Sequence, residues 1–385
     1  MVATFVLKKI FNFKYIFLII LSASYVIKQD STYFQKTFKK DLEYCETCFQ
    51  TQTEQCSAFL NTTLPTDSLI LRSFYILTNW IRPDKVIRHL RLKSTKIEIV
   101  GKYFSNRKRL NQIKNDLIST DALRHYLIND ESIGRFHLCP QFGLNRFINY
   151  FLQIPNQYVE DNTSNRERTI LVYMLIHVQP LILPLLQANG FPVPNIYATC
   201  GFSIFQSNAG QSMTAYRKSP FDLKLKIAKQ ILEAAIMFSY GFANFRIYIT
   251  DMSEDNIFYD ATVNKVYFVD LDTIFVIDSE SIGHDGVHRH DLIECHNCFA
   301  YSPDDLCSHK LSDMNLFAAC QLLRDNTHNS FGGFLKPYPE NHSTLFPKLA
   351  ALLDICVECP VQKCHNRFAV TLQIIDILEE YSKNI

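Results

Sequence analysis

The order of hydrophobic and polar positions predicts a strand-rich part followed by a helical part. Residues 96–104 run apolar over the length of a strand, and short apolar runs on either side of Gly201 predict two strands joined by a turn. Over 221–242, apolar residues recur with helical spacing on one face, and lysines lie on the opposite face. This pattern predicts the clearest helix of the chain. The pattern is that of an α+β fold.

Further helices are predicted from apolar spacing at 146–152, 167–186, 314–323 and, as a pair, 345–381. Pro180 is expected to end the helix that starts at Glu167, and the polar segment 157–166 before it is expected to be an exposed loop. Residues 279–311 are polar and show no clear period. The larger, helical part of the chain therefore lies toward the C-terminus.

The first thirty residues differ from the rest. Lys8, Lys9 and Lys14 precede an apolar run from Tyr15 to Ile27, an arrangement typical of a secretory signal peptide. The run is shorter than the roughly twenty residues that span a bilayer, which favours a cleaved signal over an uncleaved anchor or a buried core helix. Either of the first two interpretations places residues 30–385 in the lumen of the secretory pathway.

Composition narrows the class of protein. The chain has 385 residues, of which 47% are hydrophobic and 20% charged, enough to bury a large core. Its net charge of +1 gives no reason to expect a nucleic acid or an anionic membrane surface as partner. We expect membrane contact only through an N-terminal anchor.

The twelve cysteines, an even number, favour disulfides in an oxidising compartment. Three Cys-x-x-Cys pairs (Cys45/Cys48, Cys295/Cys298 and Cys356/Cys359), with nearby histidines, leave structural zinc open as an alternative. Disulfides are the preferred interpretation, and no zinc is expected. Sequons at Asn61, Asn162 and Asn341 suit surface loops of a glycoprotein.

The candidate chemistry follows the clearest helix. Asn256 comes five positions after Asp251, and Asp270 ends an apolar run fourteen residues further on. Two short strands separated by residues 260–264 would bring Asn256 and Asp270 to the same end of a hairpin. Phosphoryl transfer from ATP needs metal ligands and a group that orients the acceptor hydroxyl. We therefore predict Asp251 as the catalytic residue and Asn256 and Asp270 as ligands of Mg or Mn. Alternatively, these residues serve only the turns.

Two more residues are candidates for binding ATP. Lys102 stands late in an apolar strand and is the predicted phosphate lysine, unless it is a solvated strand-end residue. Glu167 is its predicted partner on a later helix, unless it complements the helix dipole from the first turn. Asp313 is expected to brace the backbone of the catalytic loop, to cap the helix that it precedes, or both.

Together these residues resemble the Deleted-in-Autism family of divergent protein kinase domains, which is related to the pancreatitis-induced, cysteine-rich kinase-like proteins of the endoplasmic reticulum. The resemblance covers most of residues 44–365. Its strongest pieces are Cys45-Glu-Thr-Cys48 with Cys56, His137-Leu-Cys139-Pro, Glu167-Arg, Tyr197-Ala-Thr-Cys200-Gly201, Tyr248 to Asn256, Val266 to Asp278, and Asp313-Met-Asn-Leu-Phe-Ala-Ala-Cys320.

The resemblance implies a bilobal protein-kinase-like fold, disulfide-bonded, with a small β-rich N-lobe and a larger helical C-lobe. It also implies a place in the Golgi or endoplasmic reticulum lumen and secretion as a paracrine factor. We expect a signal peptide or short anchor at 1–28, a cysteine-bearing N-terminal region at 29–96, the N-lobe at 97–212 and the C-lobe at 213–385.

The chain departs from ordinary kinases at several positions. Ile249-Thr250 precedes Asp251 where His-Arg is usual, and Leu271-Asp272 follows Asp270 where Phe-Gly is usual. No Gly-x-Gly-x-x-Gly precedes Lys102, and the chain has only 11 glycines. The residues that would bind the metal and orient the acceptor hydroxyl are present. The residues that bind the ATP phosphates in ordinary kinases, or that contact a phosphate on the activation loop, are missing or replaced.

Three functions stay open. The first is a secreted or lumenal kinase-like protein that binds ATP with Mg or Mn and transfers phosphate to a protein or glycan hydroxyl. The second is an inactive pseudokinase that acts as a secreted ligand or scaffold for a cell-surface receptor. The third is a disulfide-rich binding module with no nucleotide site. Stabilisation by nucleotide separates the first from the other two.

Overall fold

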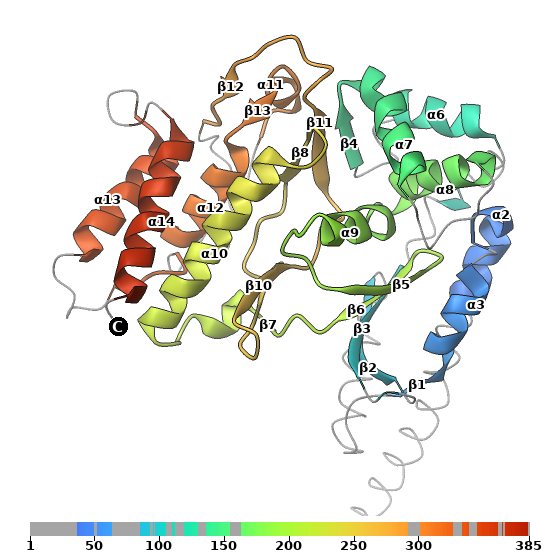
Figure 1. The fold of residues 1–385 in the computed structure, drawn as a ribbon, viewed down its shortest axis with the longest axis horizontal. Helices are drawn as coiled ribbons and strands as arrows, with labels where there is room; N and C mark the ends of the chain where they lie inside the picture. Colours follow the sequence, from blue (N-terminus) through green and yellow to red (C-terminus); the bar gives the residue numbers. More distant parts are fainter. Residues whose placement is uncertain are drawn as a thin grey trace, which may run out of the picture. The chain divides into compact units, whose positions relative to one another are not determined.

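The computed structural model describes residues 37–49, 52–63, 85–92, 95, 97–104, 110–111, 119–129, 136–154, 163–291, 301–325, 333–338, 345–360, 364 and 366–383 (Figure 1). They belong to two compact units. Unit 1 consists of Met1–Asn129, Pro155–Pro180 and Asn195–Asn208, and unit 2 of Asp130–Ile154, Leu181–Pro194 and Ala209–Ile385. The signal or anchor predicted at 1–28, Cys295, Cys298 and two of the three sequons (Asn162 and Asn341) lie outside the described residues.

Unit 1 is built on an antiparallel sheet with the strand order β1-β2-β3-β6-β5. The strands are β1 (Thr62–Thr63), β2 (Lys85–Leu92), β3 (Glu98–Phe104), β5 (Ile196–Cys200) and β6 (Ser203–Ser207). The strand predicted around Lys102 is confirmed as β3, where Lys102 pairs with Ile204. The turn predicted at Gly201 is also confirmed, because Gly201 has a φ of 58° between β5 and β6.

The described helices of unit 1 include α2 (Glu46–Phe49), α3 (Gln52–Ser57), η1 (Ala58–Asn61), α6 (Thr120–Asn129) and α8 (Thr163–Ile176). Phe49 is fully buried and its ring packs against Tyr173 of α8 and Phe202. A disulfide between Cys56 and Cys200 joins α3 to the end of β5. The cysteine-bearing N-terminal region therefore shares a core with the sheet.

The helix predicted within 167–186, with Pro180 as its stop, is confirmed only in part, because this stretch holds two helices. Helix α8 ends at Ile176, and a second helix, α9 (Gln179–Ala188), begins three residues later. Pro180 lies in the first turn of α9, where a missing N–H costs nothing, so this proline starts a helix instead of ending one. The polar segment 157–166, predicted to be a loop, contributes Thr163 and the three residues after it to α8.

No single helix among the described residues is long and apolar enough to cross a membrane. The consecutive helices Ser164–Ile176 and Gln179–Ala188 meet that criterion only when taken together as a bent pair.

Unit 2 contains a sheet of β4 (Phe136–Cys139), β11 (Ile274–Asp278) and β8 (Phe245–Ile249), with β11 in the middle. Strand β11 runs parallel to β4 and antiparallel to β8. A second sheet has the order β10-β9-β7, formed by Lys265–Phe268, Ile257–Asp260 and Gln211–Ser212. Strands β12 (Val287–His288) and β13 (Leu311–Ser312) form a short parallel pair.

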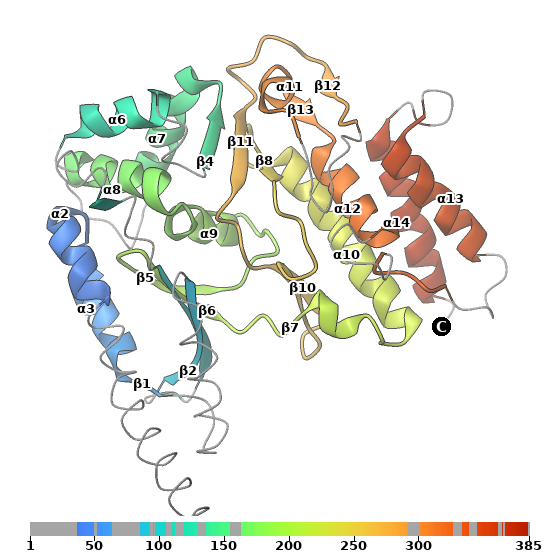
Figure 2. The same ribbon diagram turned by 180° about the vertical axis from the view of Figure 1, so that it is seen from behind.

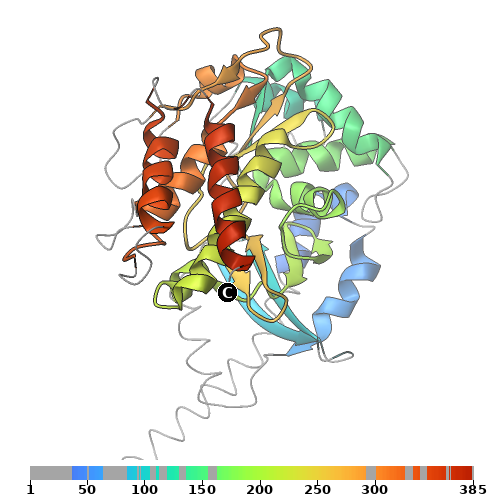
Figure 3. The same ribbon diagram turned by 60° about the vertical axis from the view of Figure 1, so that its left-hand side comes forward.

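The helices of unit 2 confirm most of the predicted C-terminal order. They include α7 (Leu144–Gln153), η3 (Met213–Tyr216), α10 (Phe221–Tyr240), α11 (Pro303–Cys307), α12 (Met314–Arg324), α13 (Leu345–Glu358) and α14 (Arg367–Lys383). Helix α10 packs against α12 and α14, and α13 packs against the same two helices (Figure 2, Figure 3). Two segments of the predicted N-lobe, 130–154 and 181–194, belong to this unit.

Disulfides close both units, which confirms the expected disulfide-bonded fold. They join Cys45 to Cys48, Cys56 to Cys200, Cys139 to Cys307, Cys320 to Cys356 and Cys359 to Cys364. Every cysteine among the described residues is paired. Of the described Cys-x-x-Cys motifs, only Cys45/Cys48 closes on itself.

Candidate active site

Strand β8 carries the chain to the predicted catalytic loop. Ile247, Tyr248 and Ile249 are buried, so this strand is fixed in the core of unit 2. Asp251 follows two residues after the strand ends, and its side chain is exposed. A rigid buried strand thus presents an exposed carboxylate at its end.

The loop between β8 and β9 is closed by its own hydrogen bonds. The Asn256 side-chain amide donates to the Asp251 carbonyl at 3.1 Å, and the Asn256 N–H donates to the Ser253 carbonyl at 3.1 Å. The Asp251 carboxylate makes no hydrogen bond or ion pair with any described residue. The two ends of the Asp-x4-Asn motif are therefore adjacent, with the carboxylate available to a substrate.

The predicted hairpin brings Asn256 and Asp270 together. Ile257 of β9 pairs with Phe268 of β10, and beyond this pair the Val269 N–H donates to the Asn256 carbonyl at 3.0 Å. Asp270 is the next residue. The hairpin forms here because its turn residues suit it: Asp260 accepts from the Thr262 N–H at 2.8 Å. The placement expected from the sequence for these two residues is confirmed.

A second connection runs beside the loop. Residues 250–256 link β8 to β9, and residues 269–273 link β10 to β11, while β8 pairs with β11 and β9 with β10. The Thr250 hydroxyl ties the two connections by donating to the Thr273 carbonyl at 2.7 Å. Asp251, Asn256, Asp270 and Asp272 consequently lie on two neighbouring segments of unit 2.

Helix α12 braces β8 through a buried asparagine that was not predicted from the sequence. Asn315 is fully buried; its oxygen accepts from the Ile249 N–H at 2.9 Å and its amide donates to the Ile247 carbonyl at 2.8 Å. Nearby, the Tyr248 hydroxyl accepts from the Ser312 N–H at 2.7 Å. The available signal was a polar residue inside an apolar helical run, since such a residue must find hydrogen-bond partners when buried.

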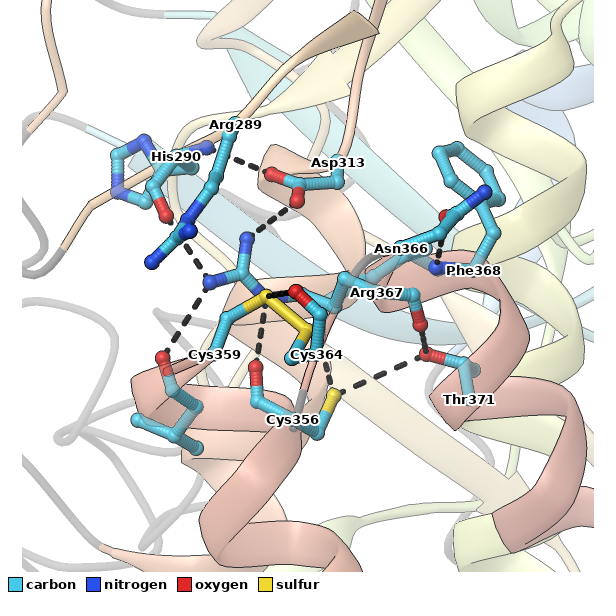
Figure 4. The surroundings of a disulfide bond; sticks show 12 residues. Arg289, His290, Asp313, Cys356, Cys359, Cys364, Asn366, Arg367, Phe368 and Thr371 are labelled. Carbon is cyan, nitrogen blue, oxygen red and sulfur yellow. Dashed lines mark hydrogen bonds and ion pairs between the residues drawn. A yellow bond between two sulfur atoms is a disulfide. The ribbon is translucent and has the colours of Figure 1, made fainter. Parts of the chain in front are cut away.

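Asp313 occupies the predicted N-cap position of α12, but its side chain makes no capping hydrogen bond there. Instead of bonding to the catalytic loop, its side chain accepts from the His290 N–H at 2.7 Å and pairs with Arg367 at 2.5 Å (Figure 4). Arg367 also donates to the carbonyls of His290 and Cys356, at 3.0 and 2.5 Å. Burial raises the pKa of Asp313, and Arg367 and the His290 amide oppose that rise. Asp313 therefore anchors the segment before α12, while Asn315 braces the strand.

Lys102 and Glu167 lie in unit 1 and have different partners there. The Lys102 ammonium, half-buried on β3, lies 3.5 Å from the Gln179 side-chain oxygen. Glu167 lies in the second turn of α8 and accepts from Arg124 of α6 at 2.7 and 3.0 Å. The predicted pairing of Glu167 with Lys102 is thus replaced by a pairing with Arg124. The role of both residues in ATP binding stays a prediction.

The donor atoms in unit 2 suit a hard divalent cation. Asn256 uses its amide N–H within the loop, and its side-chain oxygen accepts no hydrogen bond from any described residue. Asp270 and Asp272 add half-buried carboxylates. Among the described residues, no group of three or more His, Cys, Asp or Glu side chains could hold a metal ion. Mg²⁺ in phosphoryl-transfer sites commonly takes one or two protein carboxylates with phosphate oxygens, and these residues fit that pattern.

Comparison with known proteins points to one family. Residues 172–359 match the family described as the protein-kinase domain of FAM69. Human and mouse proteins named "Divergent protein kinase domain 2A" are each 25% identical to this chain over 262 residues, and the Xenopus tropicalis protein of that name is 25% identical over 261. These matches cover 64% of this chain and 60% of each relative. The family match includes Asp251, Asn256 and Asp270, whereas Lys102 and Glu167 precede it.

Proposed function

We propose that this chain, which is similar to divergent protein kinase domains over residues 172–359, binds ATP with Mg or Mn and transfers phosphate to a protein or glycan hydroxyl. The observation that carries the proposal is the Val269–Asn256 backbone hydrogen bond at 3.0 Å. It holds Asn256 beside Asp270, on a loop that Asn256 also closes onto Asp251.

Each residue of the loop has one task. The exposed Asp251 carboxylate orients the acceptor hydroxyl and accepts its proton. Asn256 and Asp270 hold the cation through oxygen atoms, and a bound divalent cation would neutralise charge on the phosphates. Asn315 keeps β8 in place and so fixes the starting point of the loop.

Lys102, in unit 1, stays the residue that the sequence predicts to contact phosphate oxygens. An ammonium group acts there as a point charge that attracts phosphate oxygens. Glu167 pairs with Arg124 in this structure, and its part in binding ATP stays a prediction as well.

A second function is favoured by a different observation. The chain contains no Gly-x-Gly-x-x-Gly, and Asp272 adds negative charge where ordinary kinases have glycine. Both differences weaken phosphate binding. They favour an inactive pseudokinase that acts as a secreted paracrine ligand or scaffold for a cell-surface receptor.

The proposed location is the lumen of the Golgi or endoplasmic reticulum, with secretion from there. Disulfides persist in oxidising compartments, and all described cysteines are disulfide-bonded. The basic and apolar N-terminal segment adds to this proposal. Recovery of the protein from culture medium of expressing cells, with its N-terminus sequenced, checks both secretion and cleavage.

Nucleotide-dependent stabilisation tests the metal residues. The purified chain is heated with and without Mg-ATP or Mn-ATP, beside Asp270→Ala and the matched control Asp376→Ala, an exposed residue of α14. A ligand at a hundredfold excess over its Kd adds about 2.7 kcal/mol of stability. We expect this gain in the wild type and in Asp376→Ala and its loss in Asp270→Ala.

Two results would contradict the assignment: equal stabilisation of Asp270→Ala and the wild type, or no stabilisation of the wild type at all. The second result would favour the inactive pseudokinase that acts as a ligand or scaffold. Asp251→Ala serves as the other arm of this experiment. It should keep nucleotide stabilisation while ADP production is lost, because its carboxylate serves the acceptor and not the metal.

A further inference from the structure

A short segment that leads the chain into unit 2 is docked onto the candidate catalytic loop and its hairpin. Unit 2 resumes at Ala209, and β7 then pairs with β9 through Gln211 with Tyr259 and Ser212 with Phe258. The Tyr216 hydroxyl donates to the Tyr259 carbonyl at 3.1 Å. We call residues 210–217 the entry segment.

The entry segment also holds the interior of the loop itself. Arg217 donates through Nε and Nη2 to the two carboxylate oxygens of Glu254, both at 2.6 Å. One residue on, Asp255 accepts from the Thr214 hydroxyl at 3.1 Å. The side chains of Arg217 and Glu254 are only 17% and 7% exposed. A bidentate guanidinium–carboxylate pair fixes orientation as well as distance, and low exposure reduces its screening by solvent.

Glu254 lies between the two functional ends of the loop, Asp251 and Asn256. A loop closed by a few weak hydrogen bonds can rearrange unless its central residues are bound by another segment. Here the entry segment binds Glu254 and Asp255, in the centre of the loop. We propose that Arg217 is a positioning residue for this site: by clamping Glu254, it sets the direction in which Asp251 faces the acceptor hydroxyl. This inference rests on the proposed phosphoryl transfer.

The clamp should affect turnover more than nucleotide binding. Asp270 lies on the other connection, and Asn256 keeps its backbone bond to Val269, so the metal ligands have support that does not depend on Arg217. The Asp251 side chain makes no hydrogen bond or ion pair with any described residue, so its direction depends on how the loop backbone is held. A misplacement of about 1 Å can cost about a hundredfold in rate.

Lys224 is a further cation that interacts with this pair. It is buried in α10 and donates to the Lys336 carbonyl at 3.2 Å. Burial lowers its pKa, the charge of Arg217 lowers it further, and Glu254 opposes both. A lysine cannot supply the two parallel N–H donors of a guanidinium. The positive charge of Lys224 therefore cannot substitute for the two hydrogen bonds that Arg217 donates to Glu254.

The test compares Arg217→Met, Arg217→Lys and the exchange Arg217→Glu with Glu254→Arg in the full chain. The matched control is Arg324→Met, because Arg324 is 14% exposed and pairs with Asp325, Asp354 and Glu358 at the far end of α12. We expect Arg217→Met and Arg217→Lys to lower kcat about 10- to 100-fold, with the KM for ATP changed less than about threefold. The exchange should recover part of kcat, and Arg324→Met should leave it unchanged.

Equal kcat in Arg217→Met and Arg324→Met, with both less stable, would show that Arg217 is structural only. If the wild type neither turns over nor responds to nucleotide, the proposed function fails, and hydrogen exchange then tests the clamp by itself. Amides 253–256 should exchange faster in Arg217→Met than in Arg324→Met. Identical exchange in the two variants would overturn the clamp whatever the activity.

Discussion

At the residue scale, two polar side chains at the start of α12 hold the backbone of other segments. Asn315 is fully buried and satisfies one carbonyl and one N–H of β8. Asp313 is 3% exposed and satisfies the N–H of His290. Buried polar groups are costly unless hydrogen-bonded. These two side chains therefore determine which backbone segments can pack beside α12.

Arg367 extends this anchoring to the end of α13. Besides Asp313 and the His290 carbonyl, it binds the carbonyls of Cys356 and Val357, which lie in the last turn of that helix (Figure 4). The last carbonyls of a helix have no partner inside it. A single guanidinium thus caps α13 and neutralises Asp313.

We expect Arg367→Met to destabilise the folded protein by about 3–5 kcal/mol near neutral pH, because it leaves a buried carboxylate without its cation. Burial already raises the pKa of Asp313 and Arg367 opposes this, so the variant should raise it further. A carboxyl whose pKa is higher in the folded than in the unfolded state makes its full contribution to stability at a pH below its unfolded pKa, about 4. That contribution is lost as the pH rises through the folded pKa. The destabilisation should therefore grow with pH.

Chemical denaturation at about pH 4.5 and pH 7.5, chosen to bracket that rise, checks this prediction. The double variant Arg367→Met/Asp313→Asn is the control, since it lacks the titrating carboxyl and should lose stability with pH less steeply. Parallel pH profiles for the single and double variants would show that Asp313 is not the group responsible.

At the element scale, the β9–β10 hairpin and strand β7 together carry the site. The hairpin follows from turn chemistry close by in sequence, as Asn264 with a φ of 53° and Asp260 illustrate. Strand β7 is only two residues long, and its pairing with β9 depends on the close approach of Gly210. Gly210 has a φ of 86°, and a Cβ there would overlap the Tyr259 carbonyl oxygen.

Gly210→Ala should therefore separate β7 from β9. The positive φ alone costs about 1–2 kcal/mol for a residue with a Cβ, and the overlap adds to it. Gly283→Ala is the matched control, because a methyl group at Gly283 would meet no atom within 4 Å and its φ is not positive. Denaturation should show a loss for Gly210→Ala alone, and hydrogen exchange should rise at Phe258 and Tyr259. Equal stability of the two variants would contradict this account of β7.

At the scale of the whole molecule, each unit has its own disulfides. Two of the five described bonds lie in unit 1 and three in unit 2, and each joins residues of one unit. The bonds differ greatly in the length of chain that they close. Cys139 and Cys307 are 168 positions apart, whereas Cys359 and Cys364 are 5 apart.

A longer closed loop removes more entropy from the unfolded chain, and these two lengths differ by about 3 kcal/mol on that basis. We expect Cys139→Ser/Cys307→Ser to lower the free energy of unfolding by about that much more than Cys359→Ser/Cys364→Ser. Denaturation of both variants, with the remaining disulfides oxidised, measures the difference. A greater loss in the Cys359/Cys364 variant would mean that local packing outweighs chain entropy here.

Local signals in the sequence were enough to predict the main elements of the site. Periodicity predicted β3 and α10, and the spacing of Asp251, Asn256 and Asp270 predicted the hairpin that brings the last two together. These features depend on residues that lie close to one another in the sequence. Pro180 was misjudged because a proline has the same sequence appearance before a helix as after one.

The sequence by itself determined the order of elements and the residues of the candidate loop. Only the tertiary structure decided the partners: Arg124 for Glu167, Arg367 for Asp313, Asn315 for β8 and Arg217 for Glu254. The bonds of Glu167, Glu254 and Asn315 to these partners join residues 37 to 68 positions apart in the chain. Helices α12 and α13 lie between Asp313 and Arg367 in the sequence. The sequence separation between a charged side chain and its partner has no preferred value. Which residue becomes the partner therefore depends on which segments pack together.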